Sequence, residues 1–516
     1  MALFPSSAAD VTADFPQSIA PKMTDTSTAD NPFRAARLEK LAAVRNLGIL
    51  PYPYAFPVTG EAKAAEEKYA GLAAGATTED RLAVAGRIRA MRNSGLFIDL
   101  HDATGKIQIF SHKDFLAPEQ LALVKLLDIG DIIGVEGKVR RTPRGELTLN
   151  AARVTLLAKA LLPLPEKYHG LADIETRYRQ RYLDLIMSEE SRATLRNRSL
   201  VVATIRRLLG ARGFLEVETP MLQAIPGGAA AKPFTTHHNA LDLDLYLRIS
   251  PELYLKRLLV GGLSDRLYEI NRNFRNEGIS PRHNPEFTLL ELYQAHVDYV
   301  AMMEMTEHLI AETAKVVCGG TRVVYQGTEI DLTPPWRRRG MADLVREHTG
   351  IDFLAIDNDV DARASARRLG IEIADTASWG HAFYAAFEAR CEATLIAPIH
   401  VTGFPREVSP LTKADRDDPR LTERFETFIN GGEFANAYSE LNDPVDQLER
   451  FEAQMHEREL GDEEAQRLDR DFVTALEYGM PPAGGLGIGI DRLVMLLTDS
   501  ASIRDVIAFP TLRPKG

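Results

Sequence analysis

Residues 274–291 read FRNEGISPRHNPEFTLLE, and this segment constrains the fold of the chain more than any other. Arg275 and Glu277 are two residues apart, so on an extended strand their side chains lie on the same face. Gly278 and Pro281 then predict a loop, and a second apolar run predicts a strand that returns beside the first. The segment therefore predicts a β-hairpin that carries charged groups at its turn.

The side chains of this hairpin are suited to binding a nucleotide. His283 stands in the loop, and Phe287 and Glu291 follow on the returning strand. A guanidinium, a carboxylate, an imidazole and an aromatic ring can together contact phosphates and a base. An ordinary surface hairpin with scattered charges is the competing interpretation, and the hairpin alone favours it.

The composition limits the class of protein. The 516 residues suffice for about three domains, and no apolar run approaches the roughly 18 residues that a membrane-spanning helix needs. The two cysteines, Cys318 and Cys391, have no metal-binding or disulfide spacing, which favours a reducing, cytoplasmic location. The net charge of -12 argues against a general affinity for nucleic acid. We therefore expect no membrane and no DNA among the partners, and any contact with RNA to be local.

The N-terminal part is predicted to hold a tail and a helical extension. Residues 1–30 are rich in Ala, Ser, Thr, Asp and Pro and have no hydrophobic period, so we expect a disordered tail. Residues 31–80 form the N-terminal helical extension, which begins with an amphipathic helix within 31–50. The apolar residues of this helix lie near one face: Phe33, Leu38, Leu41 and Val44.

Residues 81–160 have the pattern of a small β-barrel. Five strand-like runs are separated by turn residues, and a helical stretch lies near 114–127. Five strands with one helix are the outline of an OB-fold. The runs are LAVAGRIRAM, GLFIDLHD, GKIQIFS, DIIGVEGKVRR and ELTLNAARVTLL.

Two side chains of this barrel could contact single-stranded RNA. Phe97 and Gln108 fall on neighbouring strands, where an aromatic ring can stack on a base and an amide can bind its edge. The barrel core is the competing location for the Phe97 ring.

A linker over residues 161–189 precedes one α+β unit over residues 190–516. A helix over about 190–212 opens the unit, and a long helix near 446–478 precedes the glycine-rich run GGLGIGI. Short strands alternate with polar connections, as in an antiparallel sheet flanked by helices. We expect strands at about 215–220, 245–249, 267–271, 286–293, 434–441 and 485–490.

Three segments of this unit occur in an order and spacing that resemble motifs 1, 2 and 3 of the class II aminoacyl-tRNA synthetases. They are GFLEVETP (213–220), FRNEGISPRHNPEF (274–287) and GLGIGIDRLVML (485–496). The OB-fold ahead of them resembles the subclass that contains the aspartyl, asparaginyl and lysyl enzymes. PGGAAAKPFTTHHNALDLDLYLRISPELYLKRL (226–258) and YSELNDP (438–444) are similar to the bacterial lysyl-tRNA synthetases almost residue for residue. The resemblance covers about residues 31–515.

The resemblance implies a lysine–tRNA ligase that activates L-lysine with ATP, releases pyrophosphate and charges tRNA(Lys). Such a reaction needs mainly positioning and charge neutralisation from the protein. Arg275 and Arg492 match the motif 2 and motif 3 arginines, so they are the expected catalytic residues. Further ATP contacts are implied for Glu277, His283, Asn284 and Phe287, and Mg2+ is implied as the cofactor.

The lysine pocket and the metal ligands are also implied by the family. An ε-ammonium group needs an anionic pocket, and the family's lysine-binding positions fall on Gly228, Glu252, Arg275, Glu291, Tyr293, Asn436 and Glu440. Glu426 and Glu433 match the glutamates that hold Mg2+, a cation that prefers oxygen ligands. Ala437-Tyr438 departs from the Gly-Phe that bacterial members often have there. In the OB-fold, Phe97 and Gln108 are the expected anticodon contacts.

Two other functions are alternatives. A relative that attaches lysine to elongation factor P lacks the OB domain that this chain has. A non-catalytic RNA-binding remnant would lack the motif arginines, and both are present. Because motif 1 forms a twofold interface in the family, we expect a homodimer.

Overall fold

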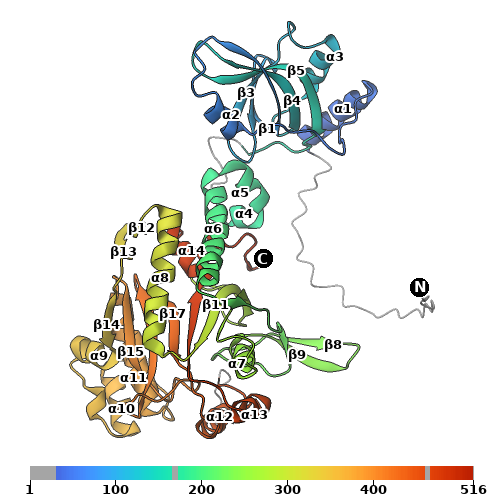
Figure 1. Cartoon of the computed structure of the whole chain (residues 1–516). Coiled ribbons are helices and arrows are strands. Elements are labelled where there is room, and N and C mark those ends of the chain that lie inside the picture. Colours follow the sequence, from blue (N-terminus) through green and yellow to red (C-terminus); the bar gives the residue numbers. More distant parts are fainter. Residues whose placement is uncertain (1–30, 166–172, 460–464, 515–516) are drawn as a thin grey trace. The chain divides into compact units, whose positions relative to one another are not determined.

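The computed structural model describes residues 31–165, 173–459 and 465–514. The chain divides into two compact units, Met1–Ala172 with Pro514–Gly516, and Asp173–Arg513 (Figure 1). The predicted tail over residues 1–30 lies outside the described residues. In the part of the chain that the structure describes, no helix is long and apolar enough to span a bilayer.

The smaller unit is built on a closed five-stranded barrel, with strand order β1-β2-β3-β5-β4. Alternate residues of its strands point inward, so Ile98 and Leu100 are buried together with Ile107 and Ile109. This arrangement confirms the predicted OB-fold. The strands are β1 (Thr77–Arg92), β2 (Phe97–His101), β3 (Lys106–Phe110), β4 (Ile132–Arg141) and β5 (Leu147–Ala158).

Three helices accompany the barrel: α1 (Pro32–Asn46), α2 (Ala62–Lys68) and α3 (Pro118–Leu126). Asn31 caps α1 by accepting hydrogen bonds from the backbone of its first turn, which satisfies donors that the helix leaves unpaired. Val44 of α1 and Ala62 of α2 belong to the barrel core. The predicted extension and the barrel therefore share one core.

The larger unit is organised by an eight-stranded sheet of order β14-β15-β16-β17-β18-β11-β10-β6. Its central pairs are antiparallel, whereas the outer strands β14 and β6 pair in parallel with their neighbours. The three strands β14 to β16 were absent from our predictions. The bounds are β6 (Leu215–Glu216), β10 (Arg266–Phe274), β11 (Glu286–Ala295), β14 (Arg337–Gly340), β15 (Ile399–Pro405), β16 (Leu421–Ile429), β17 (Gly432–Ser439) and β18 (Ala483–Gly489).

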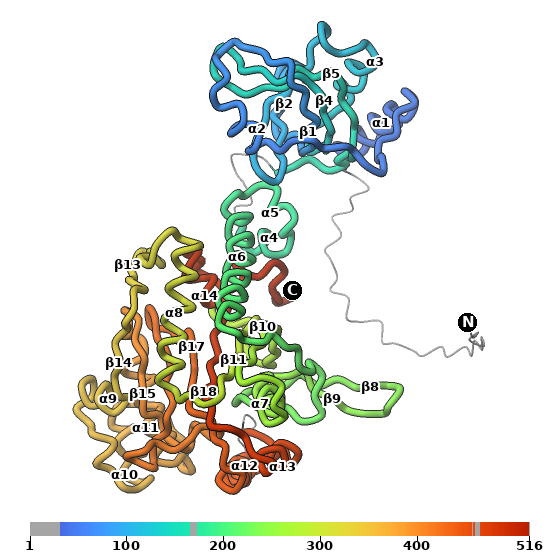
Figure 2. Tube along the Cα trace, viewed as in Figure 1, coloured from blue at the N-terminus to red at the C-terminus, as the bar shows by residue number. Residues whose placement is uncertain are grey.

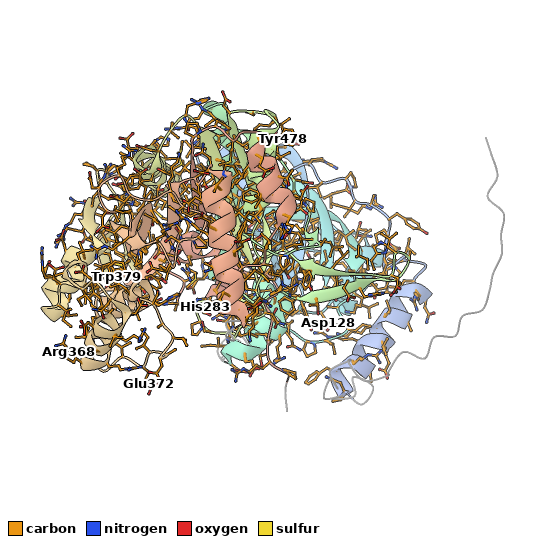
Figure 3. All side chains as sticks on the ribbon, turned by 90° about the horizontal axis from the view of Figure 1, so that it is seen from below. Asp128, His283, Arg368, Glu372, Trp379 and Tyr478 are labelled. Atoms are coloured by element: carbon orange, nitrogen blue, oxygen red, sulfur yellow. The ribbon has the colours of Figure 1, made fainter. Side chains whose placement is uncertain are left out.

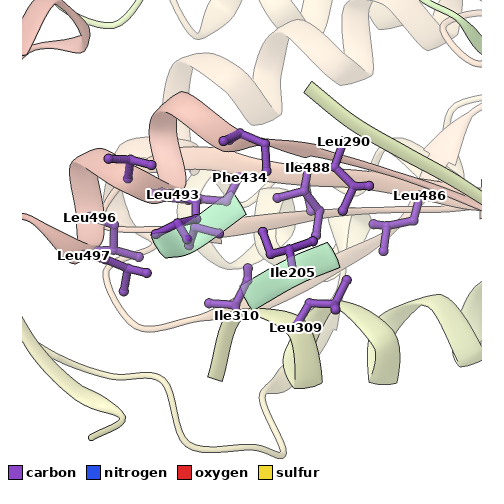
Figure 4. Close-up of a cluster of buried hydrophobic side chains, with 14 of the residues drawn as sticks. Ile205, Leu290, Leu309, Ile310, Phe434, Leu486, Ile488, Leu493, Leu496 and Leu497 are labelled. Carbon is purple, nitrogen blue, oxygen red and sulfur yellow. The ribbon is translucent and has the colours of Figure 1, made fainter. Parts of the chain in front are cut away.

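One face of this sheet is covered by the helices α6 (Glu189–Ala211), α8 (Tyr299–Cys318) and α14 (Ile490–Leu497). Figure 4 shows Ile205 of α6 and Leu309 of α8 packed together with Leu290 and Ile488 of the sheet. Burial of this apolar surface is the main source of the unit's stability. The opposite face of the central strands is left for polar side chains.

The remaining elements surround the ends of the sheet. The helices α9 (Met341–Thr349), α10 (Asp359–Arg368) and α11 (Trp379–Arg390) form a second core with β15, and α7 (Glu252–Val260) and α13 (Arg470–Glu477) form a third. Strands β7 (Leu222–Gln223), β8 (Thr235–His238) and β9 (Leu243–Leu247) make a separate small sheet, whose β8–β9 hairpin projects from the unit (Figure 2). The strand expected at 245–249 belongs to this small sheet.

Two predictions of helical boundaries differ from the structure. The long helix expected near 446–478 is two helices, α12 (Pro444–Glu459) and α13, and residues 465–469 between them are not helical. Part of the expected linker forms α4 (Ile174–Arg179) and α5 (Arg181–Met187) of the larger unit. Arg181 is buried there and donates hydrogen bonds to the carbonyl oxygens of Arg504 and Ala508, which fixes these helices to the C-terminal segment.

Candidate active site

The alternation of side chains along β11 separates the hydrophobic core from a polar face. Leu290 and Leu292 point into the core below the sheet, so Glu291 and Tyr293 point to the other face. The same period places Gly485, Gly487 and Gly489 of β18 on the polar face, because Leu486 and Ile488 belong to the core. The central strands therefore carry apolar side chains on one face and polar side chains on the other.

Strand register aligns four residues of this polar face in one row. Glu291 lies opposite Gly487, Gly487 opposite Asn436, and Asn436 opposite Glu426. Neighbouring strands are about 4.8 Å apart, so the row crosses the middle of the sheet. A Cβ atom at Gly487 would have its nearest neighbour 3.7 Å away. Gly487 thus leaves open space in the row between the Glu291 carboxylate on one side and the side chains of Asn436 and Glu426 on the other.

A cavity of about 630 Å³ lies over this row. It is lined by most of the residues that the sequence predicted for substrates: Gly228, Glu252, Arg275, Glu277, His283, Asn284, Phe287, Glu291, Tyr293, Glu426, Glu433, Asn436 and Arg492. Glu440 is fully buried beside this lining. The structure therefore brings together residues that are more than 260 positions apart in the chain (Gly228 and Arg492).

Arginines and an aromatic ring define one region of the cavity. The Arg275 guanidinium lies 5.1 Å from the centre of the Phe287 ring, and its Nε is buried without a hydrogen-bond partner in the described chain. Arg492 donates to the Glu433 carbonyl oxygen at 2.6 Å and lies 3.3 Å from Nε2 of His283, which Figure 3 labels. Burial and the charge of Arg492 lower the pKa of His283. A neutral imidazole and two guanidinium groups suit a triphosphate.

Two predicted ATP contacts have different surroundings. Glu277 lies exposed in the loop between β10 and β11. Asn284 is buried, its amide nitrogen donates to the carbonyl oxygen of Glu286 at 2.6 Å, and its Oδ1 accepts from the backbone of Thr511 at 3.3 Å. The Asn284 side chain is therefore engaged in holding the loop to the C-terminal segment.

Carboxylates define a second region of the cavity. Ser250 donates to Glu291 at 2.9 Å, and the Tyr293 hydroxyl lies 3.4 Å from the same carboxylate. Tyr438 donates to Glu252 at 2.8 Å. Tyr438 thus places a hydroxyl group at the cavity lining beside the Glu252 carboxylate.

The electrostatics of this region favour a cationic ligand. Burial, together with the nearby charge of Glu252, raises the pKa of Glu291 to about 8. Burial raises the pKa of Glu440 as well, and Glu252 adds to this shift while Lys256 opposes it. A ligand with ammonium groups would reverse these shifts, because an adjacent positive charge stabilises a carboxylate.

Glu426 and Glu433 suit Mg2+ that arrives with a nucleotide. Both carboxylates line the cavity, and no group of three or more His, Cys, Asp or Glu within the described ranges is arranged to hold a metal alone. Mg2+ typically takes one or two carboxylates and completes its octahedral shell with phosphate and water. Burial raises the pKa of Glu426, Arg424 opposes this shift and Glu433 reinforces it. A cation at this place would therefore be favoured.

Sequence reasoning missed two charged residues that hold these groups. Arg424 donates to Glu426 at 2.6 Å and to Asn436 at 3.1 Å; its position two residues before Glu426 on one strand was the available signal. Lys256 lies 2.6 Å from Glu252 and also forms an ion pair with Glu440. Its spacing of four residues from Glu252 places both side chains on one helical face.

The two predicted RNA contacts lie in the smaller unit. Phe97 lies outside the buried barrel core and packs against Phe110, with ring centres 5.0 Å apart. Arg140 lies over Phe110 at 4.3 Å. Gln108 is hydrogen-bonded to Thr148 through its Oε1 at 3.1 Å, so its amide nitrogen is the group oriented for another acceptor.

Comparisons with known proteins agree with these observations. The family model for class II tRNA synthetases (D, K and N) matches residues 173–513, and the model for the OB-fold nucleic acid binding domain matches residues 82–157. The chain is 52% identical over 493 residues to a lysine–tRNA ligase of Sinorhizobium medicae, covering 96% of this chain and 99% of the relative. It is 55% identical over 481 residues to a lysine–tRNA ligase of Carboxydothermus hydrogenoformans, covering 93% and 97%. The chain therefore belongs to the class II tRNA synthetases of the D, K and N group.

Proposed function

We propose that the chain is a lysine–tRNA ligase that activates L-lysine with ATP in the cavity over β11, β17 and β18. The observation that carries this proposal is the division of the cavity into a carboxylate-rich region and an arginine-rich region on one sheet face. L-Lysine presents two ammonium groups to the first region and its carboxylate to the second. Aspartate or asparagine would leave the buried carboxylates unpaired, which is costly.

The activation step joins the two substrates at Arg275. The lysine carboxylate oxygen attacks the α-phosphorus of ATP, the bond from that phosphorus to the bridging oxygen of the β-phosphate breaks, and pyrophosphate leaves. Arg275 would bridge both reactants with its planar fork, and Asn436 would orient the carboxylate. Arg492 and His283 would hold the terminal phosphates, while Phe287 stacks on the adenine and Glu277 binds its edge. A terminal hydroxyl of tRNA(Lys) then attacks the carbonyl carbon and displaces AMP.

The pocket for lysine combines the residues of the carboxylate-rich region. Glu291, Tyr293 and Glu440 would hold the ε-ammonium group, and Gly228 and Glu252 the α-ammonium group. A Cβ atom at Gly228 would lie 2.9 Å from Glu252 Cβ. Glycine at this position therefore keeps the backbone close to the amino acid.

Mg2+ is the proposed cofactor, held by Glu426 and Glu433 together with the phosphates of ATP. When bound, it would neutralise charge on the triphosphate. Arg424 would keep Glu426 oriented toward the cavity.

The smaller unit is proposed to bind the anticodon of tRNA(Lys). Phe97 would stack on a base, and the amide nitrogen of Gln108 would contact a base edge. The neighbouring Phe110 ring and the Arg140 guanidinium would extend this stacking surface.

We also propose a homodimer that acts in the cytoplasm. Four exposed leucines on α6, β6, β7 and β9 of the larger unit could be covered by a second copy of the chain: Leu200, Leu215, Leu222 and Leu243. Sedimentation equilibrium should give twice the mass of the chain, and an active monomer would contradict the proposal.

ATP–pyrophosphate exchange tests the proposed reaction most directly. We expect exchange with lysine and none above background with aspartate or asparagine, followed by lysine attachment to tRNA(Lys). Exchange without tRNA charging would instead indicate that lysine is transferred to another acceptor.

A further inference from the structure

A buried lysine of the chain itself lies behind the proposed lysine pocket. Lys256 belongs to α7, and its side chain is fully buried. Its Nζ lies 2.6 Å from Oε1 of Glu252 and forms a second ion pair with Glu440. The rings of Tyr438 and Phe472 enclose it, with centres 5.7 Å and 6.0 Å from Nζ.

Lys256 remains charged in this place. Burial disfavours its ammonium form, but the carboxylates of Glu252 and Glu440 outweigh burial and raise its pKa. Lys256 is not part of the cavity lining, so it leaves the ligand space open. A buried ion pair contributes little net stability when compared with apolar side chains of the same size, so a structural role alone gives little reason for these charges.

The charges in the pocket match the proposed substrate only if Lys256 is counted. Three carboxylates surround the ligand place: Glu252, Glu291 and Glu440. One ammonium group subtracted from three ionised carboxylates leaves two negative charges, and L-lysine brings two ammonium groups. Without Lys256, the carboxylates of Glu252 and Glu440 would lose the cation that they share.

We propose that Lys256 is a positioning residue for substrate recognition: its ammonium group holds Glu252 and Glu440 in place and cancels one pocket charge. The remaining two charges then select an amino acid with two ammonium groups. This inference rests on the proposed lysine site. The titratable groups around Lys256 are Glu252 on its own helix, Tyr438 and Glu440 at the end of β17, and Glu291 with Tyr293 on β11.

Two substitutions separate charge from hydrogen bonding. Lys256→Met keeps the length of the side chain and removes its charge, and Lys256→Gln also removes the charge but keeps a hydrogen-bond donor. We expect both to raise the KM for lysine in the exchange reaction by about tenfold or more, the equivalent of one pKa unit of lost charge interaction. The KM for ATP should stay within about twofold of the wild type, because the two partners of Lys256, Glu252 and Glu440, are proposed lysine contacts and not ATP contacts. Lys315→Met is the matched control, because it removes an exposed ion pair with Glu312 on α8.

Proton release on lysine binding distinguishes a charge role from a merely structural one. Calorimetric titration in two buffers of different ionisation enthalpy at pH 7 should show more protons released by the variants than by the wild type, because without the Lys256 ammonium group a further carboxyl group must ionise when lysine binds. Wild-type lysine affinity in Lys256→Gln would overturn the charge role. A parallel rise in both KM values without additional proton release would also overturn it. A wild-type chain that lacks lysine-dependent exchange would instead refute the proposed function itself.

Discussion

Arg275 has two features that a lysine side chain cannot reproduce. Its guanidinium plane lies over Phe287, and its Nε is buried without a protein partner in the described chain. Arg275→Lys keeps the charge but loses the bidentate fork, so we expect the exchange rate to fall by about 100-fold or more, as when one transition-state donor is removed. Arg272→Lys, which alters an ion pair with Glu286 at the end of the same hairpin, should leave the rate near that of the wild type. Equal rates for both variants would contradict the assigned role.

We expect Glu291 to make lysine binding depend on pH. Because the pKa of Glu291 is raised to about 8, its carboxyl group is largely protonated at neutral pH when the pocket is empty. Binding of lysine requires the ionised carboxylate. The Kd for lysine should therefore fall by up to about tenfold per unit as the pH rises from 6 toward 8, and level off above it. Calorimetric titration across this range measures the dependence.

The control for this prediction is Glu286→Gln, because Glu286 lies on the same strand but is exposed. It should preserve the pH dependence, and Glu291→Gln should abolish it. The same shift also affects stability. Since the folded state holds this proton more tightly than the unfolded state, the contribution of Glu291 to the unfolding free energy is present below pH 4.5 and is lost as the pH rises to about 8.

At the scale of the element, β18 is the strand whose glycines leave room for side chains of the cavity. A Cβ atom at Gly485 would collide with Oε1 of Glu440 and lie 2.7 Å from Cε1 of Tyr293. Gly485→Ala should therefore displace the pocket carboxylate, at a cost of about 1–3 kcal/mol, and raise the KM for lysine. In Gly487→Ala the new Cβ atom would lie 3.7 Å from its nearest neighbour, the carbonyl oxygen of Asn436. The effect of this substitution on the packing of the protein should therefore be small. Thermal unfolding and exchange kinetics of the two variants test this difference, and equal destabilisation would contradict it.

At the scale of the whole molecule, the barrel and the catalytic unit have separate cores. A change on the barrel surface should therefore affect RNA binding and leave lysine activation intact. We expect Phe97→Ala to lower kcat/KM for tRNA charging by about 5- to 150-fold, the loss of one stacked base, with unchanged exchange. Phe33→Ala removes an exposed ring of α1 in the same unit and serves as the control. A loss of exchange in Phe97→Ala would show that the two activities are not separate.

Local sequence patterns predict much of the fold and of the candidate site of this protein. The period of two along residues 286–293 already separates Leu290 and Leu292 from Glu291 and Tyr293, because a strand has only two faces. The motif residues Arg275 and Arg492 could likewise be identified from the sequence, since their neighbours along the chain mark them. The OB-fold was predicted from its five strand-like runs, and the class II fold from the resemblance of three segments to the family's motifs; both predictions are confirmed.

Only the tertiary structure decided which distant residues meet. Lys256 and Glu440 are 184 positions apart, and their ion pair arises because α7 packs beside the end of β17. The row that joins Glu291 to Glu426 depends on the register of four strands, and no local period encodes that register. Propensity and periodicity act within one element, whereas the alignment of elements is set by how their apolar faces pack together. For this reason the sequence identified the carboxylates of the pocket, and the structure revealed the cation that holds two of them.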